Sequence, residues 1–239
     1  MRLGLLLPTF RHTPITALEA AADAEALGLD GVFAYDHLWP MGSPERPAIA
    51  PFEILATVAV RHRSLVVGPL VARVGLVSDD VLLGQLRALR VVAGGRCIAA
   101  LGTGDHKSRE ENLAYGIDFA LPDERRAAMR SIAAALIDDG VEVWIGGGSA
   151  ATREIAVELG CTLNLWDATP GEVADAAARS EVCWSGPMPV ADGAPDVLAV
   201  ARLARGLEGA GATWAVFGAP ARAHAVAALR DELGRAAAL

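Results

Sequence analysis

The chain of 239 residues contains few aromatic residues, three cysteines and a single lysine, Lys107. Its 21 Lys and Arg residues form no dense basic run and the formal net charge is −8, which argues against nucleic-acid binding. The odd, widely spaced set of Cys97, Cys161 and Cys183 gives neither a disulfide framework nor the ligand spacing of a zinc site. Unpaired cysteines are typical of a reducing compartment, so we expect a cytoplasmic protein.

Long hydrophobic runs are also missing. No stretch of about 20 apolar residues occurs, so we expect no membrane span. The apolar start of the chain is interrupted by Pro8 and is too short for the core of a signal peptide. The hydrophobic content of 53% nevertheless excludes general disorder. A chain of this length buries roughly 70–75% of its unfolded surface, which is enough for a substantial core.

Short apolar runs alternate with longer amphipathic segments along the whole chain. Strands are predicted at 2–7, 30–35, 65–71, 97–101, 141–145, 162–166, 181–185 and 213–217. Helices are predicted from a Thr13 cap with Pro14 at the first helical position, at 51–61, 81–92, 109–115 and 124–138, from the caps Ser149 and Thr169, and at 197–207 and 220–233.

Eight strands that are each followed by helix predict parallel pairing with right-handed crossovers. We therefore expect an α/β fold, a (β/α)₈ TIM barrel that forms a single domain over residues 1–239. The alternative is an open doubly wound sheet. It is less favoured because the count of units is eight and no Gly-x-Gly-x-x-Gly follows the first strand.

In a barrel the active site lies at the carboxyl ends of the strands, so the candidate residues are those that follow each strand. These are Pro8, Thr9, Phe10 and His12, then Asp36, His37 and Trp39, then Ala72 and Arg73, then 102–106, and then 146–149. The pair Asp36-His37 is the most reactive of these, because a histidine exchanges protons near neutral pH. The alternative is that His37 only ties a loop to backbone carbonyls.

Two glycine-rich loops follow predicted strands. Gly146, Gly147, Gly148 and Ser149 precede a helix, where backbone amides and the helix N-terminus favour a phosphate, and Arg153 lies one turn further on. The alternative is a tight turn with Ser149 as N-cap. The second loop, Gly102, Thr103 and Gly104, either packs closely against a flat group or forms a tight barrel rim.

Glu111 and the tryptophans have structural alternatives of their own. Ser108 and Glu111 have the spacing of a capping box, which gives Glu111 the role of a helix-capping residue. Trp144, Trp166, Trp184 and Trp214 all lie in predicted strands, where they either form an apolar ligand wall at the barrel mouth or belong to the core, and we expect at least two of them in the core. No set of His, Cys, Asp and Glu has metal-ligand spacing.

Four blocks together resemble the bacterial luciferase-like monooxygenase superfamily, most closely its branch that uses the deazaflavin coenzyme F420. They are Gly31–Trp39, Gly94–Gly104, Glu111–Gly116 and Val143–Ser149, and they run in the family's order. The resemblance implies a cytoplasmic oxidoreductase with a flavin-type ring in the barrel mouth, F420 or alternatively FMN, and a small organic substrate. Family members often form homodimers, and we expect one here.

The resemblance also implies residue roles. His37 and Glu111 would be the acid and base candidates, and Asp36 would orient the site. Cofactor-binding candidates are Trp39, Gly102, Thr103, Gly104, Gly146, Gly147, Gly148 and Ser149.

The chain departs from the family pattern in one respect. Only residues 121–140 stand where a long insertion normally covers the substrate. Its absence implies an open site, a different substrate or lost catalysis. Three functions therefore stay open: an F420- or FMN-dependent oxidoreductase, a non-catalytic flavin-binding barrel, and a barrel enzyme for a phosphorylated metabolite.

Overall fold

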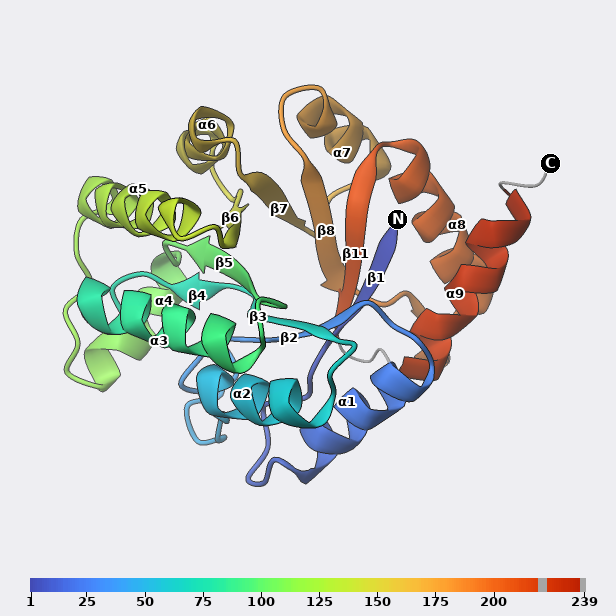
Figure 1. The fold of residues 1–239 in the computed structure, drawn as a ribbon, viewed down its shortest axis with the longest axis horizontal. Coiled ribbons are helices and arrows are strands. Elements are labelled where there is room, and N and C mark those ends of the chain that lie inside the picture. Colours follow the sequence, from blue (N-terminus) through green and yellow to red (C-terminus); the bar gives the residue numbers. More distant parts are fainter. Residues whose placement is uncertain (219–222, 237–239) are drawn as a thin grey trace.

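The computed structural model describes residues 1–218 and 223–236, and nine of their strands form one sheet that curls into a barrel (Figure 1). The strand order is β3-β2-β1-β11-β8-β7-β6-β5-β4. Every pairing in this sheet is parallel, and the first and last strands, β1 and β11, lie side by side. The prediction of an α/β TIM barrel is confirmed.

The elements follow the predicted alternation closely. The barrel strands are β1 (Arg2–Leu6), β2 (Gly31–Ala34), β3 (Val66–Pro69), β4 (Ala72–Arg73), β5 (Ile98–Gly102), β6 (Glu142–Gly146), β7 (Thr162–Trp166), β8 (Val182–Pro187) and β11 (Ala212–Gly218). The helices are α1 (Ile15–Ala26), α2 (Pro51–Arg61), α3 (Asp79–Val92), α4 (His106–Ala114), α5 (Pro122–Asp138), α6 (Ala150–Leu159), α7 (Pro170–Ala177), α8 (Val197–Gly209) and α9 (Ala223–Ala236).

Three details differ from the prediction or fall outside it. The third strand, predicted over 65–71, is divided into β3, which pairs with β2, and β4, which pairs with β5. The two pieces together close the ring, and the Leu70–Val71 peptide bond between them is cis. A short antiparallel hairpin, β9 (Val190–Ala191) and β10 (Ala194–Pro195), was not predicted. Position 220, the predicted start of the last helix, lies outside the described residues.

Capping residues fix several helix starts. The side chains of Ser149 and Thr169 accept hydrogen bonds from the backbone N–H groups three residues on, so both predicted N-caps are confirmed. The predicted Thr13 cap is wrong. Helix α1 begins one residue later, with Pro14 at the N-cap position, because the Pro14 carbonyl accepts the first helical hydrogen bond. The helix start has no side-chain capping bond.

The barrel interior is filled by aromatic rings, so it is a packed core and not a pore. Phe33 stacks on Trp144 with ring centroids 5.3 Å apart, and the edges of Trp214 meet both rings. These rings, like Trp184, are at most 2% exposed, which confirms a core role for three of the four strand tryptophans. Only Trp166 is half exposed, at the end of β7.

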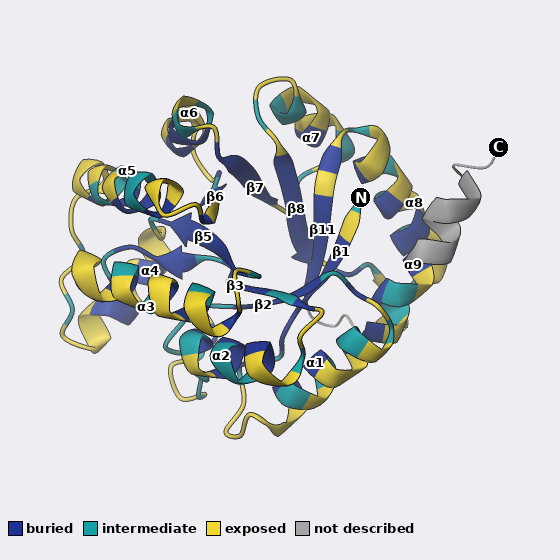
Figure 2. Ribbon diagram, in the orientation of Figure 1, coloured by how far each residue is buried: buried dark blue, intermediate teal, exposed yellow. Residues whose placement is uncertain are grey.

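Small and branched residues join the strands to the outer helices. Helix α1 presents Ala17, Ala21 and Ala24 to the sheet, all fully buried, which lets the helix backbone approach closely. Helix α3 buries Leu82, Leu86 and Leu89 at the three- and four-residue spacing that the sequence shows. Figure 2 shows the result: buried strands inside, and helices whose outer sides are exposed.

The barrel leaves no room for a side chain at Gly68 in β3. A Cβ there would lie 2.3 Å from the backbone oxygen of Ile98 on the neighbouring β5. We predict that Gly68→Ala lowers the free energy of unfolding by about 3 kcal/mol, as strong overpacking does. Gly84→Ala is the control, because Gly84 is exposed in α3 with open space around it. It should stabilise by about 1 kcal/mol in urea unfolding. Equal stability of the two variants would contradict the close packing.

Candidate active site

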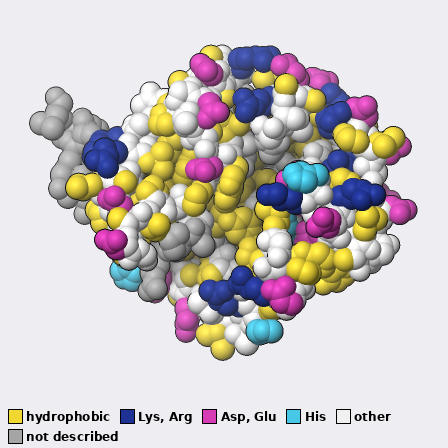
Figure 3. Space-filling model, turned by 180° about the vertical axis from the view of Figure 1, so that it is seen from behind, with side chains coloured by type: hydrophobic (Ala, Val, Ile, Leu, Met, Phe, Trp, Pro, Cys, Tyr) yellow, Lys and Arg dark blue, Asp and Glu magenta, His cyan; other side chains and the backbone are white. Residues whose placement is uncertain are grey.

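A cavity of about 860 Å³ opens at the carboxyl ends of the barrel strands. Its walls are formed by residues at or just after the ends of β1, β2, β3, β5, β6 and β7, and by Arg73 within β4. The face of the molecule in Figure 3 carries hydrophobic side chains near its middle, with basic and acidic side chains around them. The cavity lies where a barrel enzyme holds its active site, as the sequence predicts.

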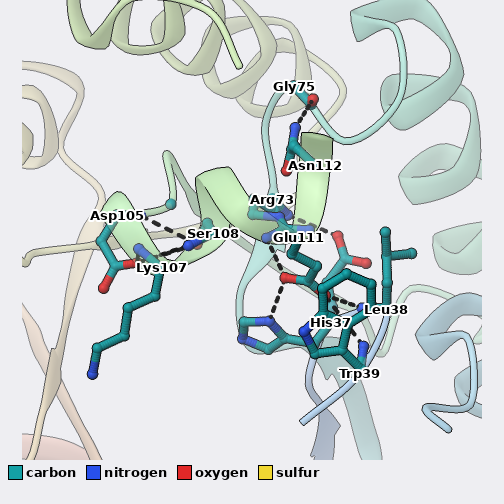
Figure 4. Close-up of polar contacts among 12 residues, drawn as sticks. His37, Leu38, Trp39, Arg73, Gly75, Asp105, Lys107, Ser108, Glu111 and Asn112 are labelled. Carbon is teal, nitrogen blue, oxygen red and sulfur yellow. Dashed lines mark hydrogen bonds and ion pairs between the residues drawn. The ribbon is translucent and has the colours of Figure 1, made fainter. Parts of the chain in front are cut away.

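Beside the cavity, hydrogen bonds to the Glu111 carboxylate join three parts of the fold (Figure 4). His37, just after β2, places its Nδ1 3.0 Å from Oε2 of Glu111 on α4. Arg73 in β4 donates from Nη1 to the same oxygen at 2.5 Å. The other oxygen, Oε1, accepts the backbone N–H groups of Leu38 and Trp39. Residues that lie far apart in the sequence therefore meet on one carboxylate.

This environment keeps Glu111 ionised. Burial by itself would raise the pKa of the carboxyl, but the hydrogen bond with His37 and the charge of Arg73 outweigh burial and lower the pKa to about 2. A carboxylate offers about four acceptor positions, and four donors meet this one. Glu111 is thus a fixed anion that holds its neighbours in place.

The same geometry assigns the imidazole proton. Because ionised Glu111 carries no proton, the bond between them requires the proton on Nδ1 of His37. Nε2 is then the nitrogen that can exchange a proton with a ligand. The His37 side chain is 20% exposed and lines the cavity, so a ligand can reach it.

The capping role that the sequence suggests for Glu111 is wrong. Helix α4 begins earlier, and Asp105 is its N-cap, accepting the backbone N–H groups of Lys107 and Ser108. The Ser108 hydroxyl accepts the Asp105 backbone N–H in return. Both N-terminal amides of α4 donate to Asp105 Oδ1, so the cap lies three residues before Ser108. Glu111 lies nearly two turns beyond the cap residue, and its carboxylate is free to bond His37 and Arg73.

Asp36 lies beside this group and holds the backbone. Its Oδ2 accepts the backbone N–H of Arg73 at 2.8 Å, which ties the end of β2 to β4. Burial raises the pKa of Asp36, while the hydrogen bond from Arg73 opposes that rise. The orienting role that the resemblance implies for Asp36 stays a prediction.

Trp39 lies at the edge of the site. Its ring centroid is 5.3 Å from that of Tyr115, which follows α4, and Trp39 is not among the residues that line the cavity. Figure 4 shows Trp39 close to His37 and Leu38. Its predicted contact with a cofactor therefore stays a prediction.

The loop Gly102, Thr103 and Gly104 forms one wall of the cavity. A Cβ at Gly102 would lie 2.4 Å from Cγ2 of Val71, and Gly104 has a φ of +67°, so both positions require glycine. Sequence reasoning missed the residue that holds this loop. Arg125, on α5 and nearly buried, donates to the carbonyls of Thr103 and Gly104. No pattern around position 125 gives a signal for this contact.

The loop Gly146, Gly147, Gly148 and Ser149 lines the cavity from the β6 side. A Cβ at Gly147 would lie 2.5 Å from Cδ1 of Leu163, so the backbone approaches β7 closely. Ser149 caps α6, and the first amides of that helix have no partner within it. Arg153 donates to the Gly147 carbonyl at 3.1 Å and also lines the cavity. This arrangement suits a phosphate.

Aromatic rings form another wall. Phe10 stacks on Tyr35 with centroids 5.4 Å apart, and Trp166 lies 6.1 Å from Tyr35. Burial raises the pKa of Tyr35 to about 12, so its hydroxyl stays protonated at neutral pH. The sequence placed Phe10 and Trp166 at strand ends but gave no sign that they share one wall with Tyr35.

The remaining reactive groups do not form a second site. The three cysteines are free and buried, and burial raises the pKa of Cys97 to about 12 and of Cys161 to about 11, so neither is an active thiolate. Among the residues whose side chains the structure describes, 1–218 and 223–229, no three His, Cys, Asp or Glu gather closely enough to hold a metal ion. The same residues include no helix that is long and apolar enough to cross a membrane.

A closed parallel barrel with an imidazole–carboxylate pair at the strand ends has the fold and the site position that are typical of barrel enzymes. Residues 1–136, more than half of the chain, match the sequence profile of a family described as luciferase-like monooxygenase. The chain belongs to this family, whose members are oxidoreductases. No curated protein sequence matches it significantly.

Solved structures support the fold at low sequence identity. One is an F420-dependent secondary alcohol dehydrogenase in complex with an F420-acetone adduct, with a TM-score of 0.79 and 13% identity, covering 96% of this chain and 97% of that one. Another is the coenzyme F420-dependent tetrahydromethanopterin reductase from Methanopyrus kandleri, with a TM-score of 0.74, 14% identity and 97% of each chain covered. The monooxygenase RslO1 from Streptomyces bottropensis has a TM-score of 0.73 at 14% identity, with 98% of each chain covered.

The ionised state of Glu111 gives a pH prediction. The pKa in the folded protein lies below the ordinary 4.5, so its stabilising effect is complete above pH 4.5 and is lost as the pH falls towards 2. This group should supply about 3 kcal/mol of the acid dependence of stability. Glu111→Gln should flatten that dependence in urea unfolding between pH 2 and 5. The control, Glu110→Gln at the exposed neighbouring position, should leave the curve parallel to that of the wild type. Parallel curves for both variants would contradict the assigned ion pair.

Proposed function

We propose that this protein binds coenzyme F420, or alternatively FMN, in the cavity at the barrel mouth and transfers a hydride to or from a small organic substrate. The observation that carries the proposal is a single cavity with two complementary walls. One wall holds His37, with Glu111 buried behind it, and the other holds the glycine loop at 146–148 and the start of α6. F420 is preferred to FMN because the block Asp36–Trp39 resembles the F420 branch.

The cavity residues suit a flavin-type cofactor in two ways. Its phosphate would be held by the backbone of Gly147 and Gly148, the Ser149 hydroxyl and the N-terminus of α6, with Arg153 adjacent. A flat ring suits walls that lack side chains, and Gly102, Gly104 and Gly146 supply such walls. The cavity of about 860 Å³ lies within the size range of cofactor sites.

When bound, the cofactor supplies the hydride donor or acceptor at its ring. His37 would exchange the accompanying proton at Nε2 with the oxygen of a substrate alcohol or carbonyl. Glu111 would stabilise the imidazolium when His37 holds that proton, as a buried carboxylate does for a histidine base. Arg73 and the amides of Leu38 and Trp39 keep Glu111 ionised and fixed. The aromatic wall of Phe10, Tyr35 and Trp166 would exclude water from one side.

Titration of the purified protein with F420, FMN and FAD tests the cofactor assignment directly. We expect selective micromolar binding of F420, seen as quenching of tryptophan fluorescence. Trp166 is the half-exposed tryptophan on the cavity wall, so Trp166→Phe should reduce the quenching.

Each other result has a definite meaning. FMN binding alone would move the assignment to the flavin branch. Tight binding without reduction by any donor would favour a non-catalytic flavin-binding barrel. Thermal stabilisation by sugar phosphates and not by flavins would select the phosphorylated-metabolite enzyme.

A second prediction concerns His37. His37→Asn removes the group that exchanges the proton but should leave cofactor binding intact, so turnover should fall about 10²–10⁴-fold at unchanged cofactor Kd. Steady-state kinetics with the best alcohol or carbonyl substrate, together with the fluorescence titration, measures both quantities. His62→Asn is the matched control, because His62 pairs with Glu25 at a distant site. Full turnover by His37→Asn would remove His37 from the mechanism.

A further inference from the structure

Arg73 is only partly used by the contacts described so far. Its side chain is 4% exposed and is one of the residues that line the cavity. Nη1 donates to Glu111, but Nε and Nη2 are buried and have no hydrogen-bond partner. A buried charged donor without a partner is costly, and such atoms are usually matched by a ligand, ion or water.

Neighbouring carboxylates supply no acceptor for Nε and Nη2 of Arg73. Both oxygens of Glu111 are occupied, by His37 and Arg73 Nη1 on one side and by two backbone amides on the other. Asp36 uses Oδ2 for the backbone N–H of Arg73 and makes no hydrogen bond to the guanidinium. The two unmatched nitrogens have no partner within the chain and almost no exposed surface, so a group from outside the chain reaches them when the guanidinium turns toward the cavity that Arg73 lines.

The positions of Nε and Nη2 in the guanidinium determine which chemical class of ligand pairs with both. Nε and Nη2 lie on one edge of the planar guanidinium, and their N–H bonds point the same way as a fork. This fork matches the two oxygens of a carboxylate, and paired N–H···O bonds to it are short and charge-assisted. A single hydroxyl would satisfy only one of the two donors.

Other arginines on the cavity wall are engaged differently. Arg125 donates from Nε and Nη1 to the carbonyls of Ala120, Thr103 and Gly104, so it holds the loop after β5. Arg126 pairs with Asp123, and Arg153 donates from Nε to the Gly147 carbonyl on the opposite side of the cavity. Arg73 alone among these four bonds to the His37–Glu111 pair.

We propose that the free edge of Arg73 is a subsite for a carboxylate, so that the substrate of this protein is a small organic acid whose carboxylate pairs with Nε and Nη2. This inference rests on the proposed function, because it takes the cavity as the substrate site. Pairing at Arg73 holds the substrate next to His37, so the alcohol or carbonyl that reacts is on a carbon close to the carboxylate.

The test compares benzoate with benzamide, which has the same shape but no charge and only one oxygen. Binding is followed by isothermal calorimetry on the purified protein, with and without saturating F420. We expect benzoate to bind the wild type at least tenfold more tightly than benzamide. Arg73→Met should abolish that preference, and Arg73→Lys should restore part of it. Arg179→Met, a change at the exposed Glu154 pair away from the cavity lining, should keep the full preference.

Other outcomes overturn the inference. It fails if the wild type binds both compounds equally, if it binds neither, or if Arg73→Met keeps the preference. Inorganic phosphate that binds at the same site as tightly as benzoate would make it a general anion site. Circular dichroism melting of each variant separates lost binding from lost folding. F420 binding that disappears in Arg73→Met while the benzoate preference stays would assign Arg73 to the cofactor.

The two proposals fail in distinguishable ways. A wild-type protein that prefers benzoate but binds neither F420 nor FMN keeps the carboxylate subsite and loses the oxidoreductase function. A protein that binds F420 without preferring benzoate keeps the function and loses the subsite.

Discussion

The carboxylate of Glu111 is the contact on which the site depends. It receives His37, Arg73 and two backbone amides, and so joins the end of β2, strand β4 and helix α4. Only an anion can accept all four donors, and the low pKa of Glu111 reflects this. Because the carboxylate is fixed, the tautomer of His37 is fixed as well. The site is therefore organised before any ligand enters, which is the condition for efficient proton transfer.

The barrel gives this carboxylate its partners. Parallel strands end on one face, so residues that follow different strands meet there although they are distant in the chain. The aromatic core of Phe33, Trp144 and Trp214 fills the barrel below. The cavity above it has a basic and acidic side at His37, an apolar side at Trp166, and a glycine side at the start of α6. A cofactor and a substrate thus meet different chemistry on each wall.

The short connection between β5 and β6 has its own consequence. It consists of α4, the turn at 115–121 and α5, where the family resemblance implies a longer insertion. Arg125 of α5 reaches back to the carbonyls of Thr103 and Gly104, and its guanidinium lies 3.8 Å from the ring centre of Phe119. The helix thereby holds the cavity wall that the glycine loop forms. The contact from α5 therefore stabilises the loop after β5.

Hydrophobic periodicity and capping residues by themselves determined the barrel and most helix starts, because these signals are local: Ser149 and Thr169 cap helices where the sequence places them. The predicted strand ends also placed His37, Asp36 and the glycine loops where the cavity lies. The capping role that the Ser108–Glu111 spacing suggested is wrong, because spacing does not show which of two competing caps forms, whereas the family resemblance had already placed Glu111 among the acid and base candidates. Only the tertiary structure decided that Asp105 caps α4 and that Arg73 reaches Glu111, and only it brought Arg125 to the β5 loop. Those contacts join residues on separate strands and helices, and their distances are set by barrel closure rather than by spacing along the chain.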